Sequence, residues 1–313
     1  MLEHSAASNN ANVPAPSDAT MKPSQGRSSR RSLLKTATWV APSAVVAVAA
    51  PAVAASPTCT TQEVQLNWGI ATVQAQTPPA ADPGVVAITQ NRVTFNPQPA
   101  ITQFPQLNSP LTATIVHRFY GAARATTVNA PVGTLGNGQV SPQNVGGIGQ
   151  VGYTLLQMVG ASGAGTPTNA DYQTIQFTFS EAITDLEFSL TDIDRIWTSA
   201  TSGTRDFIDG LSLTSPSPYR AVVPQGSSVI GSGVAPSGGS PTAPPTQPWQ
   251  NSANANQPED GPGGQIDIAF TAPVTTFTVR YDNLMRTAPR PTGTNNDQAA
   301  FVTGFRAKRP TVC

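Results

Sequence analysis

Residues 175–194 read IQFTFSEAITDLEFSLTDID, and this stretch decides the fold class. Apolar and polar side chains alternate through Thr174–Phe179 and again through Asp185–Asp192. A period of two residues is typical of a strand that buries one face, because successive side chains point to opposite sides of a sheet. We therefore predict two β-strands joined by a short turn.

A second stretch, FTAPVTTFTVRYD at residues 270–282, is similar to the first. Both read as a strand that ends in Phe, a turn that contains Ala or Pro, and a second alternating strand. Two interpretations stay open, a duplicated strand–turn–strand module and a geometry common to β-sandwiches. The apolar rows that correspond are Leu186, Phe188 and Leu190 in the first copy and Phe277, Val279 and Tyr281 in the second.

The rest of the chain shows the same alternation in short segments separated by turn residues, and 30 Pro and 26 Gly occur among 313 residues. This pattern predicts an all-β fold, a two-sheet β-sandwich or jelly roll with long Gly/Pro-rich loops. We expect residues 224–265 to form a flexible loop, and Ala75–Gly84 and Gly133–Gly152 to form further loops. The other predicted strands are Glu63–Trp68, Asn91–Phe95, Thr112–Tyr120, Tyr153–Val159, Gly210–Thr214, Gln265–Phe270, Thr276–Asp282 and Ala299–Ala307.

The first 55 residues have the pattern of an export leader. Ser29–Lys35 reads SRRSLLK, and the uncharged, Ala- and Val-rich stretch Ala37–Ala55 follows it. The paired Arg30 and Arg31 resemble the twin-arginine export signals of bacteria. A membrane anchor is the alternative, but a stretch of 19 mildly hydrophobic residues interrupted by two prolines makes a poor span. We therefore predict a disordered extension at 1–28, a cleaved signal at 29–55 and a secreted domain at 56–313.

Charge and composition exclude several classes of function. The chain has 17 basic and 17 acidic residues, and removal of residues 1–55 leaves a formal charge of −3. A nucleic-acid partner is not expected, because the basic footprint is missing. Only two His, His4 and His117, and two Cys occur, which removes most routes to zinc sites and His-dependent nucleophiles. We expect His117 to be an ordinary residue on a strand face, so chemistry would fall to carboxylates, Arg or a bound ion.

The two cysteines lie near the two ends of the predicted domain. Cys59 is the fourth residue after Ala55, and Cys313 is the last residue of the sequence. Export to an oxidising compartment permits a disulfide between them, whereas two free thiols are the alternative. We predict a Cys59–Cys313 disulfide that joins the ends of the domain.

A group of acidic residues follows the first quoted strand pair. If strand parity continues past Leu190, Asp192 and Asp194 share the face of the apolar row, and a hairpin with residues 205–214 would bring Asp209 close to them. Converging carboxylates need a cation or Arg partners, and calcium is the natural ion outside the cell. The alternative is that these residues form turns and pair with Arg195 or Arg205.

Two tryptophans in predicted loops are candidates for ligand binding. Trp197 and Trp249 could stack on sugar rings, or they could fold back to cover an edge of the core. Glycoside hydrolysis is a second candidate activity because it needs two carboxyl groups. The acids available to it are Asp192, Asp194, Asp206 and Asp209.

Residues 175–214 are similar to a segment met in bacterial exported β-sandwich proteins of surface or adhesin type. The matching pattern is Phe-x-Phe-x-x-x-Ile-Thr-x-Leu-x-Phe-x-Leu-x-Asp-Ile-Asp, from Phe177 to Asp194. The resemblance implies a fold and a location more than an activity. We expect a secreted or envelope-associated binding protein whose partner is a glycan or a cell-surface protein, with a structural calcium ion as its one candidate cofactor; a polysaccharide hydrolase is the alternative.

Overall fold

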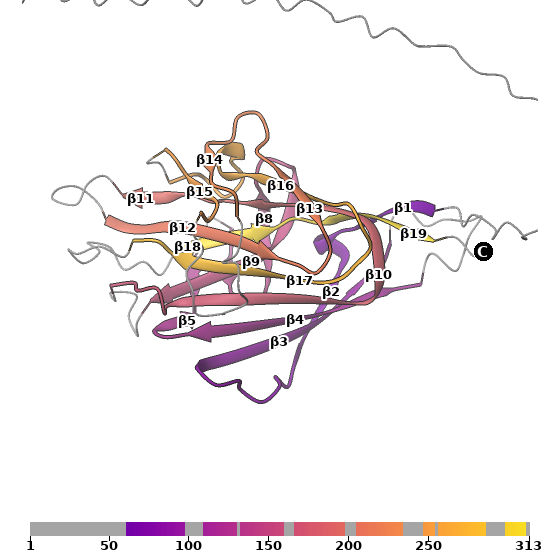
Figure 1. Cartoon of the computed structure of the whole chain (residues 1–313), viewed down its shortest axis with the longest axis horizontal. Helices are drawn as coiled ribbons and strands as arrows, with labels where there is room; N and C mark the ends of the chain where they lie inside the picture. Colours follow the sequence, from indigo (N-terminus) through magenta and orange to yellow (C-terminus); the bar gives the residue numbers. More distant parts are fainter. Residues whose placement is uncertain are drawn as a thin grey trace, which may run out of the picture. The chain divides into compact units, whose positions relative to one another are not determined.

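Almost all regular structure in the computed structural model is β-strand (Figure 1). The structure describes residues 61–97, 109–129, 132–159, 166–197, 205–233, 247–253, 256–285 and 298–310. Two short 3-10 helices, Trp68–Ile70 and Pro262–Gly264, occur among them. The all-β prediction is confirmed. Within these residues no helix has the length and hydrophobicity of a membrane span.

The strands form two sheets that share one long strand, β10 (Tyr172–Thr191). The first sheet, called sheet B, contains the first half of β10. Around it, β17 pairs with β12 on one side and β4 pairs with β3 on the other. Its remaining members are β2 (Thr72–Gln76), β3 (Val85–Phe95), β4 (Leu111–Tyr120), β11 (Arg195–Trp197), β12 (Arg205–Thr214) and β17 (Val274–Asn283).

The second sheet, called sheet A, contains the second half of β10, which pairs with β16 on one side and with β18 and β19 on the other. Beyond these, β13 pairs with β16, β1 with β19 and β9 with β18. Its members are β1 (Thr61–Leu66), β5 (Ala123–Ala125), β8 (Val140–Val145), β9 (Gln150–Val159), β13 (Tyr219–Val222), β16 (Ile266–Phe270), β18 (Gln298–Val302) and β19 (Phe305–Pro310).

The turn predicted in the first quoted stretch is a corner inside one strand. The pairing of β10 with β17 changes register between Thr178 and Ile183, and Asp185 takes a φ of 48°. Asp tolerates this left-handed conformation better than most residues. β10 therefore bends and passes from sheet B to sheet A, as Figure 1 shows where the strand curves sharply.

The second quoted stretch makes a second corner that is antiparallel to the first. β16 in sheet A leads into β17 in sheet B, and each pairs with the half of β10 in its own sheet. The apolar rows that correspond in the two copies both face the core. The two copies thus occupy equivalent places, which agrees with a duplicated module and with sandwich geometry alike.

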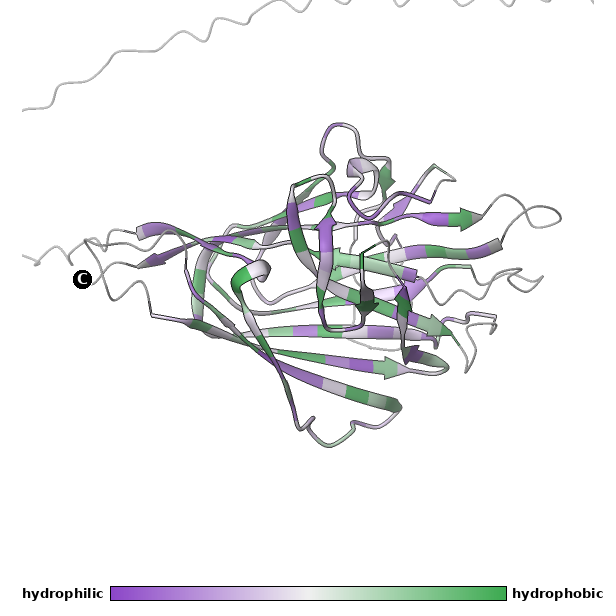
Figure 2. Ribbon diagram, turned by 180° about the vertical axis from the view of Figure 1, so that it is seen from behind, coloured by the Kyte–Doolittle hydropathy of each residue, from purple (hydrophilic) through white to green (hydrophobic). Residues whose placement is uncertain are grey.

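The core lies between the two sheets and is rich in aromatic rings. Phe188 in sheet A stacks on Phe277 in sheet B with ring centroids 5.0 Å apart, and Phe305 lies 5.8 Å from Phe95. Trp68 lies 4.9 Å from Phe95 and donates its indole N–H to the carbonyl oxygen of Thr303. Hydrophobic and hydrophilic residues alternate along the strands in Figure 2, as expected where one face of each sheet is buried.

Part of the outer face of sheet A carries a second, smaller core. The hairpin of β6 (Thr127–Asn129) and β7 (Thr134–Gly136) contributes Leu135, and β8 contributes Val145. These two residues pack against Leu156 on β9 and Phe301 on β18. The outer face over β1, β19, β10, β16 and β13 has no such cover among the described residues.

Two predicted loops contain regular structure, so these predictions are partly wrong. Gly133–Gly152 includes β7, β8 and the start of β9. Residues 224–265 include β14 (Val229–Ile230), β15 (Gln250–Asn251) and the second 3-10 helix. β7, β14 and β15 have only two or three residues each, and β8 contains a Pro, so alternation alone does not reveal them.

Several predicted features lie outside the described residues. They are the extension and leader at 1–55, with Arg30 and Arg31, and the two cysteines Cys59 and Cys313. The described strands belong to one compact unit, Ala55–Cys313. Within it β1 pairs antiparallel with β19, and Thr61 is opposite Pro310.

Candidate functional site

The structure brings together the three aspartates of the predicted metal site. The hairpin prediction is confirmed, because Arg195 on β11 pairs with Ile208 on β12. The parity prediction is wrong past Thr191: β10 ends there, and Asp192 takes a φ of 61°. The carboxylates converge through this turn rather than through one continuous strand face.

Asp194 and Asp209 are in direct contact. The backbone N–H of Asp194 donates to Oδ2 of Asp209 over 3.1 Å, and the hydroxyl of Tyr281 donates to Oδ1 of Asp209 over 2.8 Å. Oδ2 of Asp194 accepts from the backbone N–H of Gln257 over 2.7 Å. These oxygens are thus already engaged by N–H and O–H donors of the protein.

Burial makes the charged forms of these acids unfavourable. Asp192 is 6% exposed and Asp209 is completely buried. Burial, with the charges of Asp194 and Glu259, raises the pKa of Asp192 well above its usual range. Burial and the charge of Asp194 likewise raise the pKa of Asp209, against the opposing hydrogen bond from Tyr281. Oδ1 of Asp192 has no hydrogen-bond partner in the described part of the chain.

This arrangement gives little support to metal binding or to glycoside hydrolysis, the two kinds of chemistry predicted for the cluster. Over the described ranges, no three His, Cys, Asp or Glu side chains form a group that could hold a metal ion. The four candidate acids for hydrolysis are at most 7% exposed, so a sugar chain has no access to them as they stand. The acids concerned are Asp192, Asp194, Asp206 and Asp209.

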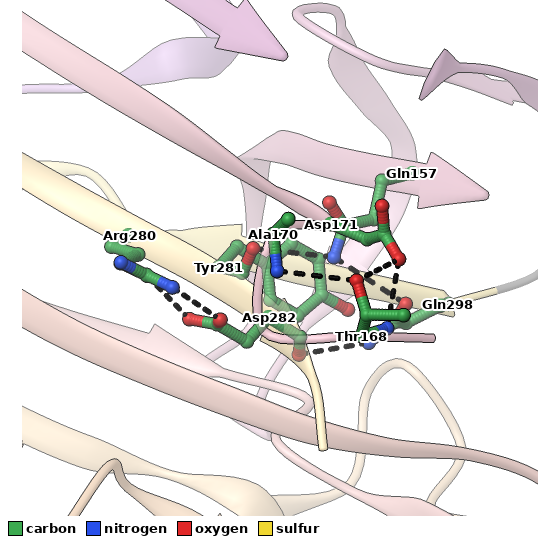
Figure 3. A network of polar contacts seen from close by, with 8 residues as sticks. All are labelled: Gln157, Thr168, Ala170, Asp171, Arg280, Tyr281, Asp282 and Gln298. Atoms are coloured by element: carbon green, nitrogen blue, oxygen red, sulfur yellow. Dashed lines mark hydrogen bonds and ion pairs between the residues drawn. The ribbon is translucent and has the colours of Figure 1, made fainter. Parts of the chain in front are cut away.

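Tyr281, which donates to Asp209, also belongs to a network of polar contacts with Gln157 and Gln298 (Figure 3). Gln157 on β9 is opposite Gln298 on β18, and both amides reach the backbone of β17. Nε2 of Gln157 donates to the carbonyl of Tyr281 over 3.3 Å, and Nε2 of Gln298 donates to that of Asp282 over 3.1 Å. Asp282 also forms an ion pair with Arg280 at 2.8 Å. The two amides therefore lie in the interior, whereas Arg280 and Asp282 alternate with the core residues Val279 and Tyr281 and stand on the opposite face of β17.

His117 belongs to a separate buried network. It points into the interior from β4, where its Nε2 lies 2.9 Å from the hydroxyl of Tyr153 and its Nδ1 lies 3.1 Å from Nδ2 of Asn137. Nδ2 of Asn91 donates to the same Tyr153 hydroxyl over 3.0 Å. Burial lowers the pKa of His117 to about 4, so the ring is neutral at pH 7.

The predicted ligand-binding role of Trp249 needs correction. Trp249 is 1% exposed, and its backbone forms two hydrogen bonds with Leu211 of β12. Its ring therefore has no free face for a sugar, and it covers an edge of the core instead. The backbone of Trp197 ends β11, and its side chain lies outside the described residues.

The open part of the outer face of sheet A carries a polar groove that sequence reasoning missed. One row of residues crosses five strands at right angles to them, because each residue is the register partner of the next. In order, the row is Gln65, Arg306, Glu187, Ala269 and Arg220. Ala269 is the small residue in this row, between a carboxylate and a guanidinium.

Two hollows lie along this groove, with volumes of about 570 Å³ and about 500 Å³. Both are lined by Glu187, Arg220, Ala269 and Arg306, so they are neighbours on the two sides of the row. Volumes of this size are typical of small-molecule sites. The larger hollow also contains Asp267 and polar residues from four strands or their ends, namely Gln65, Gln150, Ser189 and Thr303.

Hydrogen bonds and ion pairs hold most of the charged groups in the groove. Oδ1 of Asp267 accepts from the hydroxyl of Ser189 over 2.7 Å and from Nε2 of Gln265 over 2.6 Å. Arg306 lies 3.3 Å from Glu63 and 3.6 Å from Glu187, and Lys308 pairs with Asp185 at 2.7 Å. Arg220 is exposed and makes no ion pair with another described residue.

Comparison with known proteins does not suggest a function for this groove. No protein-family model, curated protein or solved structure matches the chain. The groove residues come from strands up to 243 residues apart in the sequence, as the Glu63–Arg306 contact illustrates. Apart from Ala269, the residues of the row are ordinary polar residues on the outer faces of alternating strands, so only the register of the sheet brings them together.

Proposed function

We propose that this chain is exported by the twin-arginine route and acts at the cell envelope or in the medium as a non-enzymatic binding protein. Its ligand site is the polar groove on sheet A, its ligand is a glycan, and its role is adhesion to glycan-bearing surfaces. The leader supports export, with Arg30 and Arg31 before the apolar stretch Ala37–Ala55.

The groove is the observation that carries the proposal. It offers carboxylate acceptors, guanidinium donors and neutral amide and hydroxyl groups, the mixture that can bind many sugar hydroxyls at once. These groups stand on paired strands, which fix their positions better than loops do. A cell-surface protein was the other partner predicted, but the groove residues are short of the exposed aromatic side chains that protein interfaces favour.

The hydrolase alternative has less support. A glycosidase needs one carboxyl group that carries a proton and a second that is placed across the scissile bond. The two acids in the larger hollow, Glu187 and Asp267, each already face donors of the protein. The buried acids Asp192, Asp194 and Asp209 are not lining residues of either hollow. Release of reducing sugar from the bound glycan would support the hydrolase instead.

A structural calcium ion at Asp192, Asp194 and Asp209 stays a separate hypothesis. It concerns buried residues that line neither hollow of the groove. The sign of the stability change in an Asp192 variant tests it, as set out in the Discussion.

A glycan array probed with the purified protein tests the proposed site. We expect binding that Arg220→Ala and Asp267→Asn each weaken by about tenfold or more, because each variant removes a charged hydrogen-bonding group. The matched controls are Arg92→Ala, an exposed arginine on sheet B, and Asp82→Asn, an exposed aspartate. Binding that the groove variants leave unchanged, or no binding to any glycan, would contradict the proposal.

A further inference from the structure

We infer that the groove selects a neutral oligosaccharide, and that this ligand crosses the central row at Ala269 so that one part lies in each hollow. The inference rests on the proposed function, since it names the class of glycan that the same site takes. The charge of the lining, the groups free to bind and the shape of the row each support it.

The lining of each hollow has no net charge. The larger one contains Glu187 and Asp267 against Arg220 and Arg306. The smaller one contains three carboxylates and three cations. An acidic or basic sugar would gain nothing from the net field of such a lining, and near Glu187 and Arg306 it would have to disrupt their ion pair to find a partner. A neutral, hydroxylated ligand can bind without disturbing them.

The larger hollow presents polar groups that are held in position but still have hydrogen-bonding capacity for a ligand. Ser189 and Gln265 hold Asp267 in place by hydrogen bonds to its Oδ1. None of the described residues donates a hydrogen bond to its Oδ2. Arg220 faces the same hollow with a guanidinium that has five N–H donors and no ion-pair partner among the described side chains. One acceptor and one multiple donor next to each other suit adjacent hydroxyl groups of a sugar ring.

The aromatic residues of the lining offer no stacking platform. Phe188, Phe270 and Phe305 are among the lining residues, but their exposed fractions are 4%, 3% and 1%. Hydrogen bonds must therefore supply the recognition. Such binding depends weakly on salt, in contrast with binding by charge attraction.

Ala269 is the crossing point between the hollows. It is the register partner of both Glu187 and Arg220, and a methyl group here leaves the row low between two long side chains. A large side chain at this position would separate the hollows without removing a polar group of either. Ala269→Tyr should therefore act against longer ligands more than against a monosaccharide.

The experiment titrates the purified protein with three probe sets: neutral gluco-, manno- and xylo-oligosaccharides, acidic oligogalacturonides and basic chitosan oligosaccharides. We expect the neutral set to bind best, with a Kd that changes less than about twofold between about 0.1 M and 1 M salt. We expect Ala269→Tyr to weaken oligosaccharide binding by about tenfold. Ala75→Tyr, at an exposed position on β2, is the matched control, and unchanged thermal melting shows that each variant folds.

The outcomes separate the inference from the proposed function. Preference for the acidic or the basic set, with steep salt dependence and loss in Arg220→Ala, would overturn the inference and leave the groove as the glycan site. Neutral binding that Ala269→Tyr leaves unchanged, while Arg220→Ala weakens it, would overturn the crossing at Ala269. Failure of all three sets to bind, or binding indifferent to every groove variant, would overturn both.

Discussion

The carboxyl groups of Asp192 and Asp209 are buried together, and this fixes how their protonation contributes to stability. A group whose pKa is raised in the folded state stabilises the fold at low pH, and this contribution is lost as pH rises through the folded-state pKa. At pH 7 the folded protein must therefore hold unfavourable buried charge or retain protons that the unfolded chain releases.

An Asp192→Asn variant tests this account against calcium binding. Asn resembles the protonated carboxyl, so we expect the free energy of unfolding at pH 7 to rise, on the order of 1 kcal/mol, and to depend less on pH. Calcium coordination predicts the opposite sign, together with a fall in Tm when a chelator is added to the wild type. Urea unfolding of the two proteins, with and without chelator, decides between them, and Asp82→Asn is the control at an exposed site.

Protonation of His117 should lower the free energy of unfolding in the mildly acidic pH range. Its pKa is lowered to about 4 in the folded state, from 6.5. The unfolded chain therefore binds more protons between these values, and the contribution of His117 falls as pH drops from 6.5 toward 4, by about 3 kcal/mol in all. We expect His117→Gln to be less stable than the wild type at pH 7, and we expect this difference to shrink or vanish near pH 4. A difference that stays constant over this range, measured by urea unfolding, would contradict the lowered pKa.

At the scale of elements, alternation was sufficient to predict the long central strands. Asn91–Phe95, Thr112–Tyr120 and Thr276–Asp282 all lie within observed strands, because each of these strands has one face in the core. Short strands at edges, such as β2 and β13, were missed. Most of their residues are exposed, so burial imposes little hydrophobic pattern on them.

Prediction of the candidate sites requires long-range information that the local sequence pattern does not contain. The sequence pointed to Asp192, Asp194 and Asp209 because they are close along the chain and a hairpin joins them. The groove depends on the register of five strands, and its members look like any solvent-facing residues in their own strands. The sequence left open whether Trp249 binds a sugar or covers an edge of the core, because a Gly/Pro-rich neighbourhood has no apolar pattern that decides; its burial favours the second interpretation.

The predicted Cys59–Cys313 disulfide stays a prediction, because both cysteines lie outside the described residues. Thr61 is opposite Pro310, so the described register ends two residues after Cys59 and three residues before Cys313. We expect intact-mass analysis of the exported protein after alkylation to find no free thiol. Cys59→Ser should lower the free energy of unfolding by about 2–4 kcal/mol under oxidising conditions. The same substitution should have almost no effect when both proteins are reduced, and a free thiol in the exported wild type would contradict the disulfide.

For the whole molecule, the prediction to test is the route of export. We expect Arg30→Lys combined with Arg31→Lys to keep the chain inside a bacterium that has a twin-arginine pathway, because that pathway reads the paired guanidinium groups. Cell fractionation and immunoblotting measure the result. Lys22→Arg is the control outside the motif. Unchanged export of the double variant would show that another route carries the protein.

The pairing of β1 with β19 also determines how the molecule responds to mechanical force. Thr61–Pro310 is the outermost of six paired positions, and Leu66–Phe305 is the innermost. Once the predicted Cys59–Cys313 disulfide is reduced, tension applied between the two ends would peel these pairs one at a time, instead of shearing all of them together. Glu63 and Lys308, which stand on these strands and line the smaller hollow, would separate early. Pulling on both ends of the reduced protein would thus disrupt the smaller hollow of the proposed ligand site before the aromatic core unfolds.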